Sequence, residues 1–299
     1  MTFLSEITAI QNIIYIFSSI LFITGIKMLG KEDTAVKGNF FSALAMFIAV
    51  SITLIDVVNP IVLLSGIALG AVIGSFIALK VKMTSIPEMV ALFNGFGGLA
   101  TFLIAWSEFN SIPGNLFQHV LVMTTLYIGG VTFTGSLVAY AKLSEKIKIA
   151  KTSIITKIFT TIFYISLPFL LYSTFVTPFI VTSFEFFTVL LVLTLLGGIG
   201  FVLPIGGGDM PVVISLLNSF SGIAAAFAGL LLLNNVLIVA GSLVGASGLI
   251  LTVIMAKAMN RSISNILFVG YASSSASSSS SEEQGEVSPI SVSDAYLIL

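Results

Sequence analysis

Two asparagines in otherwise apolar stretches are the first candidates for chemistry in this sequence of 299 residues. Asn94 and Asn218 each follow a proline, Pro87 and Pro211, by seven residues. An amide without a hydrogen-bond partner is costly in apolar surroundings, so both side chains should face the protein interior, joined to each other or holding water. An amide can support a water wire for protons without itself titrating, whereas polar contacts that only hold helices together are the alternative interpretation.

Three charged residues at the ends of apolar stretches form a second candidate group. Glu88 and Asp209 lie close to the two prolines, and Arg261 follows the last long apolar stretch. Ordinary solvation is the alternative for all three, and for Asp209 a helix dipole would stabilise the acid by roughly 0.3–1 kcal/mol. The only histidine, His119, is expected at the outer end of a helix, where a histidine is more often incidental than a proton carrier.

Several kinds of site are excluded by composition. The chain has no cysteine and one histidine, so disulfides, thiolate nucleophiles and Cys- or His-cluster metal sites are ruled out. The formal net charge is −1, which argues against a nucleic-acid partner because such binding needs a basic surface. The glycines at 206–208 resemble a phosphate cradle only superficially, and a turn that leads into a helix is the preferred interpretation.

The elements that must position these residues are membrane helices. The chain is 57% hydrophobic and 8% charged, with a mean hydropathy of +1.14, so most of its surface must face lipid or other apolar helices. We therefore predict an all-α integral membrane bundle of about nine transmembrane helices, with membrane lipid as a partner. The predicted helices span 8–27, 39–57, 60–79, 87–106, 118–140, 157–174, 182–203, 210–232 and 234–256.

The charges predict how this bundle is oriented. All twelve lysines and arginines fall on one side of a nine-helix arrangement, and acids without basic neighbours fall on the other. Because short basic loops stay cytoplasmic, the N-terminus is expected outside and the C-terminus in the cytoplasm. Glycines spaced four apart, as at Gly66, Gly70 and Gly74 and again at Gly241 and Gly245, predict close helix packing.

A repeat relates two pairs of predicted helices. Residues 87–100 align without gaps on 211–224, so that Asn94 coincides with Asn218, and the helix after each segment ends in an Ala-Lys pair, at Lys142 and Lys257. Both hairpins run in the same direction, which indicates a parallel repeat. Ser219 and Ser221 complete the candidate proton path with the two asparagines.

The composition changes after the last helix. Residues 273–281 are serine except for one alanine, and three glutamates follow by 286, which is typical of a flexible tether. The end of the sequence reads like the start of a capped helix. We therefore predict a transmembrane domain over 1–269, a Ser/Glu-rich linker over 270–288, and the beginning of a soluble domain over 289–299.

Several strings together resemble one family. Residues 206–222 read GGGDMPVVISLLNSFSG and are similar to the signature GGADMPVV…LNSYSG of the beta subunit of proton-translocating nicotinamide nucleotide transhydrogenases. Residues 255–262, MAKAMNRS, are similar to its IMCKAMNRS, and the segments 87–91 and 130–140 agree as well. The final residues resemble the opening of the family's NADP(H)-binding domain.

The resemblance implies a function and partners. In this family, hydride passes between NADH and NADP+ on two soluble domains while protons cross the membrane domain. NAD and NADP would thus be used by the complete enzyme, with no cofactor or metal held by this part of it. The expected partners are an alpha subunit and a second alpha-beta assembly, in the inner membrane of a bacterial cell.

The resemblance also carries over particular residues. Asn218 maps onto the proton path, and Asp209 and Arg261 onto the cytoplasmic mouth, where Glu88 is a further candidate. Many members have a histidine where this sequence has Asn94, and that histidine is regarded as the titrating group. Some members place the histidine on a helix of the alpha subunit instead, and we expect that arrangement here.

Two other classes of protein fit the pattern. A secondary transporter would also use a parallel repeat, polar residues within the membrane and glycine-rich helices. A noncatalytic assembly or channel subunit is the third possibility. Continuation of the reading frame into a glycine-rich βαβ nucleotide domain, beside a gene for an alpha subunit, would select the transhydrogenase.

Overall fold

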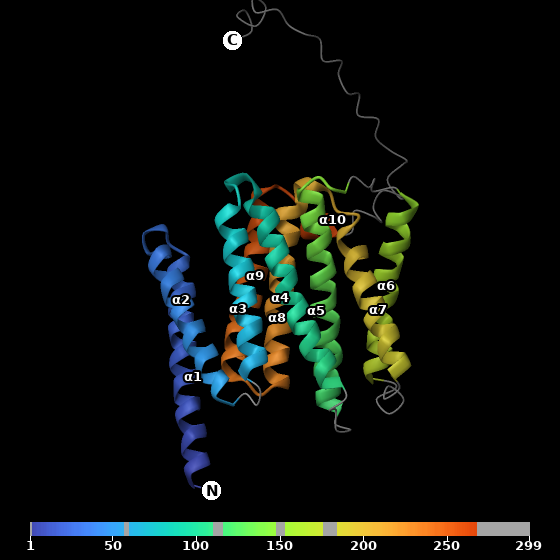
Figure 1. Cartoon of the computed structure of the whole chain (residues 1–299). Coiled ribbons are helices and arrows are strands. Elements are labelled where there is room, and N and C mark those ends of the chain that lie inside the picture. Colours follow the sequence, from blue (N-terminus) through green and yellow to red (C-terminus); the bar gives the residue numbers. More distant parts are fainter. Residues whose placement is uncertain (1, 57–59, 110–115, 148–152, 176–183, 268–299) are drawn as a thin grey trace, which may run out of the picture.

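The chain folds into a bundle of long helices. A computed structural model describes residues 2–56, 60–109, 116–147, 153–175 and 184–267, and the described part contains no strand (Figure 1). The long helices are α1 (Thr2–Leu29), α2 (Glu32–Thr53), α3 (Pro60–Lys80), α4 (Ile86–Phe109), α5 (Leu116–Leu143), α6 (Ile154–Phe175), α7 (Phe184–Val202), α8 (Met210–Leu231) and α9 (Asn235–Ala258). Short elements are the 3₁₀ turns η1 (Leu54–Asp56), η2 (Met83–Ser85) and η3 (Gly207–Asp209), and the five-residue helix α10 (Ile263–Leu267).

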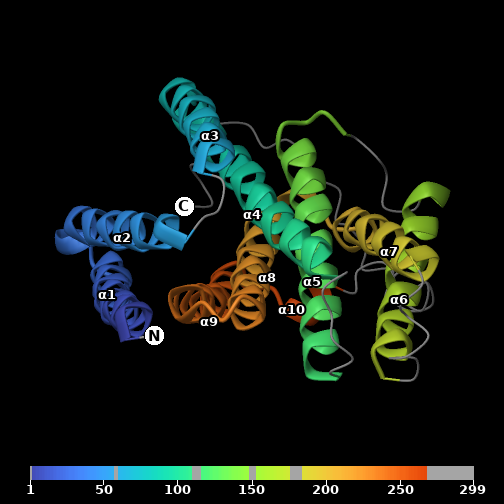
Figure 2. The ribbon, with the colours of Figure 1, turned by 60° about the horizontal axis from the view of Figure 1, so that its bottom comes forward.

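The core of the bundle surrounds α5. This helix is buried along most of its length, and it packs against α4, α7 and α8 (Figure 2). Apolar side chains such as Met123, Leu126 and Leu217 are completely buried between these helices. The α6–α7 pair flanks the core on one side, and the α1–α2 hairpin lies on the other side, where α1 contacts α9 (Figure 2).

Small residues let neighbouring helices approach closely, as the glycine spacing predicts. A Cβ atom added at Gly222 of α8 would lie 2.3 Å from the backbone nitrogen of Gly245 on α9. A Cβ at Gly98 of α4 would lie 2.9 Å from the carbonyl oxygen of Gly129 on α5. Such distances exclude any side chain, so both helix pairs depend on glycine. The glycines of α3 differ, because a Cβ at Gly66, Gly70 or Gly74 would meet nothing within 4 Å.

The α1–α2 hairpin is held by its own contacts. The Ser18 hydroxyl of α1 donates to the carbonyl oxygen of Ala45 on α2 over 2.6 Å, and a Cβ at Gly25 would lie 2.9 Å from the carbonyl of Gly38. Helix α2 begins at Glu32, earlier than the predicted start at 39. The charges near its start limit the membrane span, not the helix, because acids are favoured in a first helical turn.

The parallel repeat extends further in structure than in sequence. The turns η2 and η3 precede α4 and α8 at the same register, and each helix has proline at its second position. Beyond α5 and α9, Glu145 (φ 52°) and Asn260 (φ 52°) both adopt left-handed backbone. In each case the next residue's amide donates five residues back, from Lys146 to Ala141 and from Arg261 to Ala256, over 2.9 Å. The two hairpins are therefore terminated by the same local structure.

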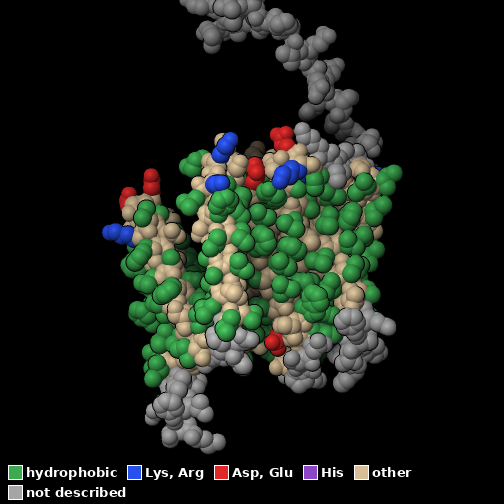
Figure 3. Space-filling model, viewed as in Figure 1, with side chains coloured by type: hydrophobic (Ala, Val, Ile, Leu, Met, Phe, Trp, Pro, Cys, Tyr) green, Lys and Arg blue, Asp and Glu red, His purple; other side chains and the backbone are tan. Residues whose placement is uncertain are grey.

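The helices have the lengths and composition of membrane spans. Among the described residues, seven helices are long and apolar enough to cross a bilayer, and shorter apolar helices cover Ile154–Leu170 and Phe187–Val202. A multi-pass helical membrane protein is thus confirmed, whereas nine crossings and their orientation stay predictions. In Figure 3 the visible lysines and arginines gather at one end of the bundle. The predicted linker and soluble segment lie outside the described residues.

Orientation can be tested on the two ends of α8. Gly208 is exposed beside the start of this helix, and Leu233 is 85% exposed just beyond its end. In cells, Gly208→Cys should react only with permeant maleimides and Leu233→Cys also with impermeant ones. These 299 residues contain no cysteine, so the same stretch without a substitution is an unlabelled control. Labelling of both positions from the same side would contradict the proposed crossing of α8.

Candidate functional site

A polar node centred on Asn94 joins three helices. The Asn94 side chain of α4 donates from Nδ2 to the Ser136 hydroxyl of α5 over 2.9 Å. Its Oδ1 accepts from the Ser221 hydroxyl of α8, also over 2.9 Å. Ser136 is completely buried, and Asn94 and Ser221 are half-buried. The amide therefore finds one acceptor and one donor partner across helix interfaces, which lowers the cost of a polar group in an apolar bundle.

The two asparagines are not joined to each other. Asn218 lies on α8 and is half-buried, and no hydrogen bond engages its side chain within the described part of the chain. Of the two expectations for the asparagines, direct pairing is wrong, because Asn94 contacts Ser221, one turn further along α8. Asn218 keeps its full capacity to donate and accept in this bundle.

Ser219 lies on another face of α8 from Ser221. Its hydroxyl donates to the Gly245 carbonyl of α9 over 2.6 Å, in the interface where glycines bring the two helices together. One turn earlier, Ser215 donates to the Gly248 carbonyl over 3.2 Å and accepts from Thr252 over the same distance. These hydroxyls form a buried polar seam between α8 and α9, separate from the Asn94 node.

In the second candidate group, Asp209 and Arg261 lie close enough to form an ion pair. Asp209 ends the turn η3, is 7% exposed, and lies with Oδ1 3.7 Å from Nε of Arg261. The carboxylate caps no helix amide, although Asp209 occupies the N-cap position of α8. Its placement is therefore not explained by helix capping.

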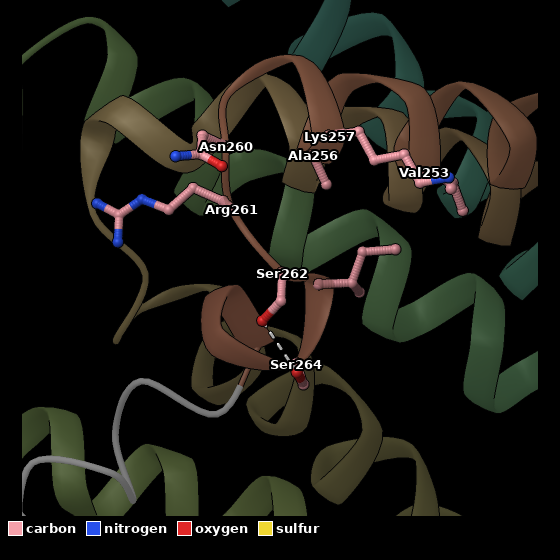
Figure 4. A pocket seen from close by; sticks show the side chains of 8 residues that line it. Val253, Ala256, Lys257, Asn260, Arg261, Ser262 and Ser264 are labelled. Atoms are coloured by element: carbon pink, nitrogen blue, oxygen red, sulfur yellow. Dashed lines mark hydrogen bonds between the residues drawn. The ribbon is translucent and has the colours of Figure 1, made fainter.

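The arginine of this pair borders an open cavity. The side chain of Arg261 is 57% exposed, and a cavity of about 590 Å³ is lined by Lys257, Asn260 and Arg261 from the end of α9, together with Ser262 and Ser264. Figure 4 shows Arg261 and Asn260 pointing to the same side, with Lys257 directed away from them. Water can reach the guanidinium, while the carboxylate stays buried.

The remaining candidates do not join either group. Glu88 is half-buried in the first turn of α4 and forms no ion pair with a described residue. Its position differs from that of Asp209, because Ser85, not Glu88, occupies the equivalent register in the repeat. His119 lies in the first turn of α5, at the predicted end of the helix, and its side chain is 5% exposed, so it is covered by neighbouring helices.

Sequence reasoning missed Ser136. The residue lies in a stretch of α5 that alternates glycine with threonine and serine, which reads simply as small-residue helix packing. The available signal was a hydroxyl at mid-helix. Which side of α5 it faces becomes evident only when α4 is packed against it.

No metal or dinucleotide site is built from the described residues. They include no group of three or more metal-ligating side chains. The turn at Gly207 and Gly208 has open space around it, but the buried carboxylate of Asp209 follows directly and would repel a pyrophosphate. These residues do not fit a dinucleotide.

The fold is that of a polytopic membrane protein with polar side chains between its helices. The sequence identifies a particular family within this class. The family model described as "NAD(P) transhydrogenase beta subunit" matches residues 11–299. The chain belongs to this family.

Curated relatives agree with the family model. The protein named NAD(P) transhydrogenase subunit beta from Rhodospirillum rubrum is 36% identical over 273 residues, which cover 87% of this chain and 58% of the relative. A second sequence of the same name, from a particular strain of that species, gives the same identity and coverage. The chain therefore spans 58% of the length of these relatives.

Proposed function

We propose that this chain is the proton-conducting membrane part of an NAD(P)+ transhydrogenase. In this proposal it works with an alpha subunit in a bacterial inner membrane, and the assembly is a dimer of alpha-beta units. Hydride transfer between NADH and NADP+ takes place on nucleotide-binding parts of the complete complex. The described residues supply the proton path and its cytoplasmic mouth.

The Asn94 node is the observation that carries this proposal. Asn94 follows Pro87 by seven residues, so it lies about 10 Å along α4 from the cytoplasmic end, at a rise of 1.5 Å per residue. Amide and hydroxyl groups at that depth can hold water and pass a proton along hydrogen bonds. Asn218, with unused hydrogen-bonding capacity on the adjacent helix, can extend this chain of groups.

In this proposal, the group that takes up and releases the proton belongs to the alpha subunit. Ser136 and Ser221, which bind Asn94, do not titrate near neutral pH, and neither does the amide itself. A proton that pauses in this node therefore needs an acid or base from another chain. A side chain on a helix of the alpha subunit would supply it.

The surface that would receive this subunit lies beside α3. An apolar groove of about 630 Å³ runs between α2, α3, α4 and α9, lined by residues such as Val50, Ile67 and Ile104. Helix α3 is not buried anywhere along its described span, and its glycines face open space. In lipid, helices associate through small residues that let backbones approach, so a helix of the alpha subunit fits this position.

Filling the glycine stripe should weaken binding of the alpha subunit. We expect Gly70→Leu to reduce recovery of the alpha subunit with the affinity-purified chain by about tenfold, because the added side chain prevents close backbone approach. Val72→Leu, directed away from Gly70 on the helix, is the matched control and should not change recovery. Equal recovery with both variants would remove α3 from the interface.

The function is tested directly by proton movement. Inverted membrane vesicles that contain the complete complex should change their internal pH when NADH and NADP+ are supplied together, and a protonophore should abolish the signal. A pH change only with a transported solute would favour the secondary transporter, which the parallel repeat also suits. Hydride transfer without any proton movement would contradict the proposed role of this chain.

A further inference from the structure

A lysine near the end of α5 binds the turn that leads to Asp209. Lys142 is half-buried, and its ammonium donates to the carbonyl oxygens of Val202 over 3.3 Å and Ile205 over 2.6 Å, and to that of Leu203. These carbonyls belong to the last residue of α7 and the turn after it. A cation beside the carbonyls of a helix C-terminus is favoured both by hydrogen bonding and by the helix dipole.

The bound turn is short, and the three glycines at 206–208 join it to Asp209. Leu203 and Ile205 are buried, and the turn has its own backbone bond from the Ile205 amide to the Val202 carbonyl over 3.1 Å. The amide of Asp209 donates to the Gly206 carbonyl over 3.1 Å, which continues the ordered path. The backbone of Asp209 is thus joined by a short hydrogen-bonded path to the segment that Lys142 binds.

The repeat provides a comparison for this lysine. Lys257 is the equivalent residue at the end of α9, but it is exposed, and within the described chain its ammonium has no hydrogen bond to a carbonyl. Figure 4 shows its side chain lying along α9, away from Arg261. The clamp is therefore specific to Lys142 and does not come from the shared Ala-Lys sequence.

We propose that Lys142 is a positioning residue that holds Asp209 beneath Arg261 and links the mouth to the Asn94 node. Ser136, which binds Asn94, lies on the same helix six residues before Lys142, about 9 Å along α5. A shift of α5 that alters the node would therefore move the turn before Asp209. That Lys142 holds the turn before Asp209 does not depend on the proposed function. The link between this turn and proton movement rests on the proposed function.

Spin labelling tests whether Lys142 holds this turn. A nitroxide attached at Gly207→Cys, where a side chain meets open space, reports motion of the turn, and these 299 residues contain no other cysteine. Any cysteines elsewhere in the complex are replaced by serine. The measurement is the electron paramagnetic resonance spectrum of the complete complex in lipid nanodiscs. Lys142→Met should narrow its lines because the label moves more freely, and Lys142→Arg should restore much of their width. Lys257→Met should leave the line width unchanged. An unchanged spectrum for Lys142→Met, in protein recovered in normal amount, would overturn the clamp.

Turnover tests the link to proton movement. Lys142→Met should reduce NADH-driven proton uptake at least tenfold, with partial recovery in Lys142→Arg and no loss in Lys257→Met. Combined with Asp209→Asn, it should cause little further loss, because both substitutions act on one group. Multiplicative losses would overturn the link. If the unsubstituted complex moved no protons at all, the proposed function would fail while the spin label still reported on the clamp.

Discussion

Replacement of Asn94 by leucine is expected to lower NADH-driven proton movement by about 5- to 150-fold, the factor that corresponds to about 1–3 kcal/mol for a polar group left without its partner. Leucine has a similar size but cannot bind Ser136 or Ser221, so the node loses its central donor and acceptor at once. The measurement is the initial rate of proton uptake by vesicles, normalised to the amount of assembled complex.

Two further variants sharpen this result. Phe93→Leu alters the preceding residue, which is 42% exposed on the bundle surface, and should leave uptake unchanged. Asn94→His restores the residue that many family members carry and retains hydrogen bonding, so some activity is expected. Normal uptake by Asn94→Leu would show that this amide only holds helices together.

Removal of the charge of Asp209 should have the second large effect. Asp209→Asn keeps the size of the side chain, and no helix-capping bond is lost because the carboxylate makes none. We expect the complex to assemble but to lose coupled turnover by about 5- to 150-fold, the range that a coupling free energy of about 1–3 kcal/mol produces. Arg261→Gln should show a similar defect, since it breaks the same pair.

The double variant decides whether the two charges act together. If they do, Asp209→Asn combined with Arg261→Gln should be little worse than either alone. The Arg261 side chain is largely exposed, so a salt bridge of this kind contributes little to stability, and the amount of folded protein should hardly change. Lys257→Gln, at the neighbouring exposed cation, is the control. Full coupled activity in both single variants would show that the Asp209–Arg261 ion pair is not needed for proton coupling.

The helices could be predicted from the sequence because apolar length and charge placement determine where a chain crosses a membrane. The break at Asn234 is an example, where a few polar residues indicated a tight hairpin. There the asparagine caps α9, its Oδ1 accepting from the Leu237 amide over 3.0 Å, after Leu233 turns the chain with φ 54°.

The partners within the site could not be predicted in the same way. Ser219 and Ser221 are two residues apart, yet one contacts α9 and the other contacts α4, because helical positions two apart face different directions. Which face of α8 meets which neighbour depends on how the helix is rotated about its own axis. Apolar residues occur on every face of α8, so the sequence does not determine this rotation. The clamp by Lys142 depends on side-chain reach across helices, which sequence spacing does not encode.

The glycines of α3 show another limit of the sequence. Their spacing predicts close packing, but no described helix of this chain occupies that face. The glycine spacing belongs to one helix and does not determine which helix, of this chain or another, packs against it.

The separation of contacts along the chain sets an order for its assembly during translation. The α1–α2 hairpin is joined by a hydrogen bond between residues 27 apart, so it can close soon after it leaves the ribosome. The Asn94 node needs Ser221, which is synthesised 127 residues later. Until α8 enters the bilayer, the Asn94 amide must rely on Ser136 and whatever water or insertion machinery lies nearby, and the polar interior of the protein is among the last parts to form.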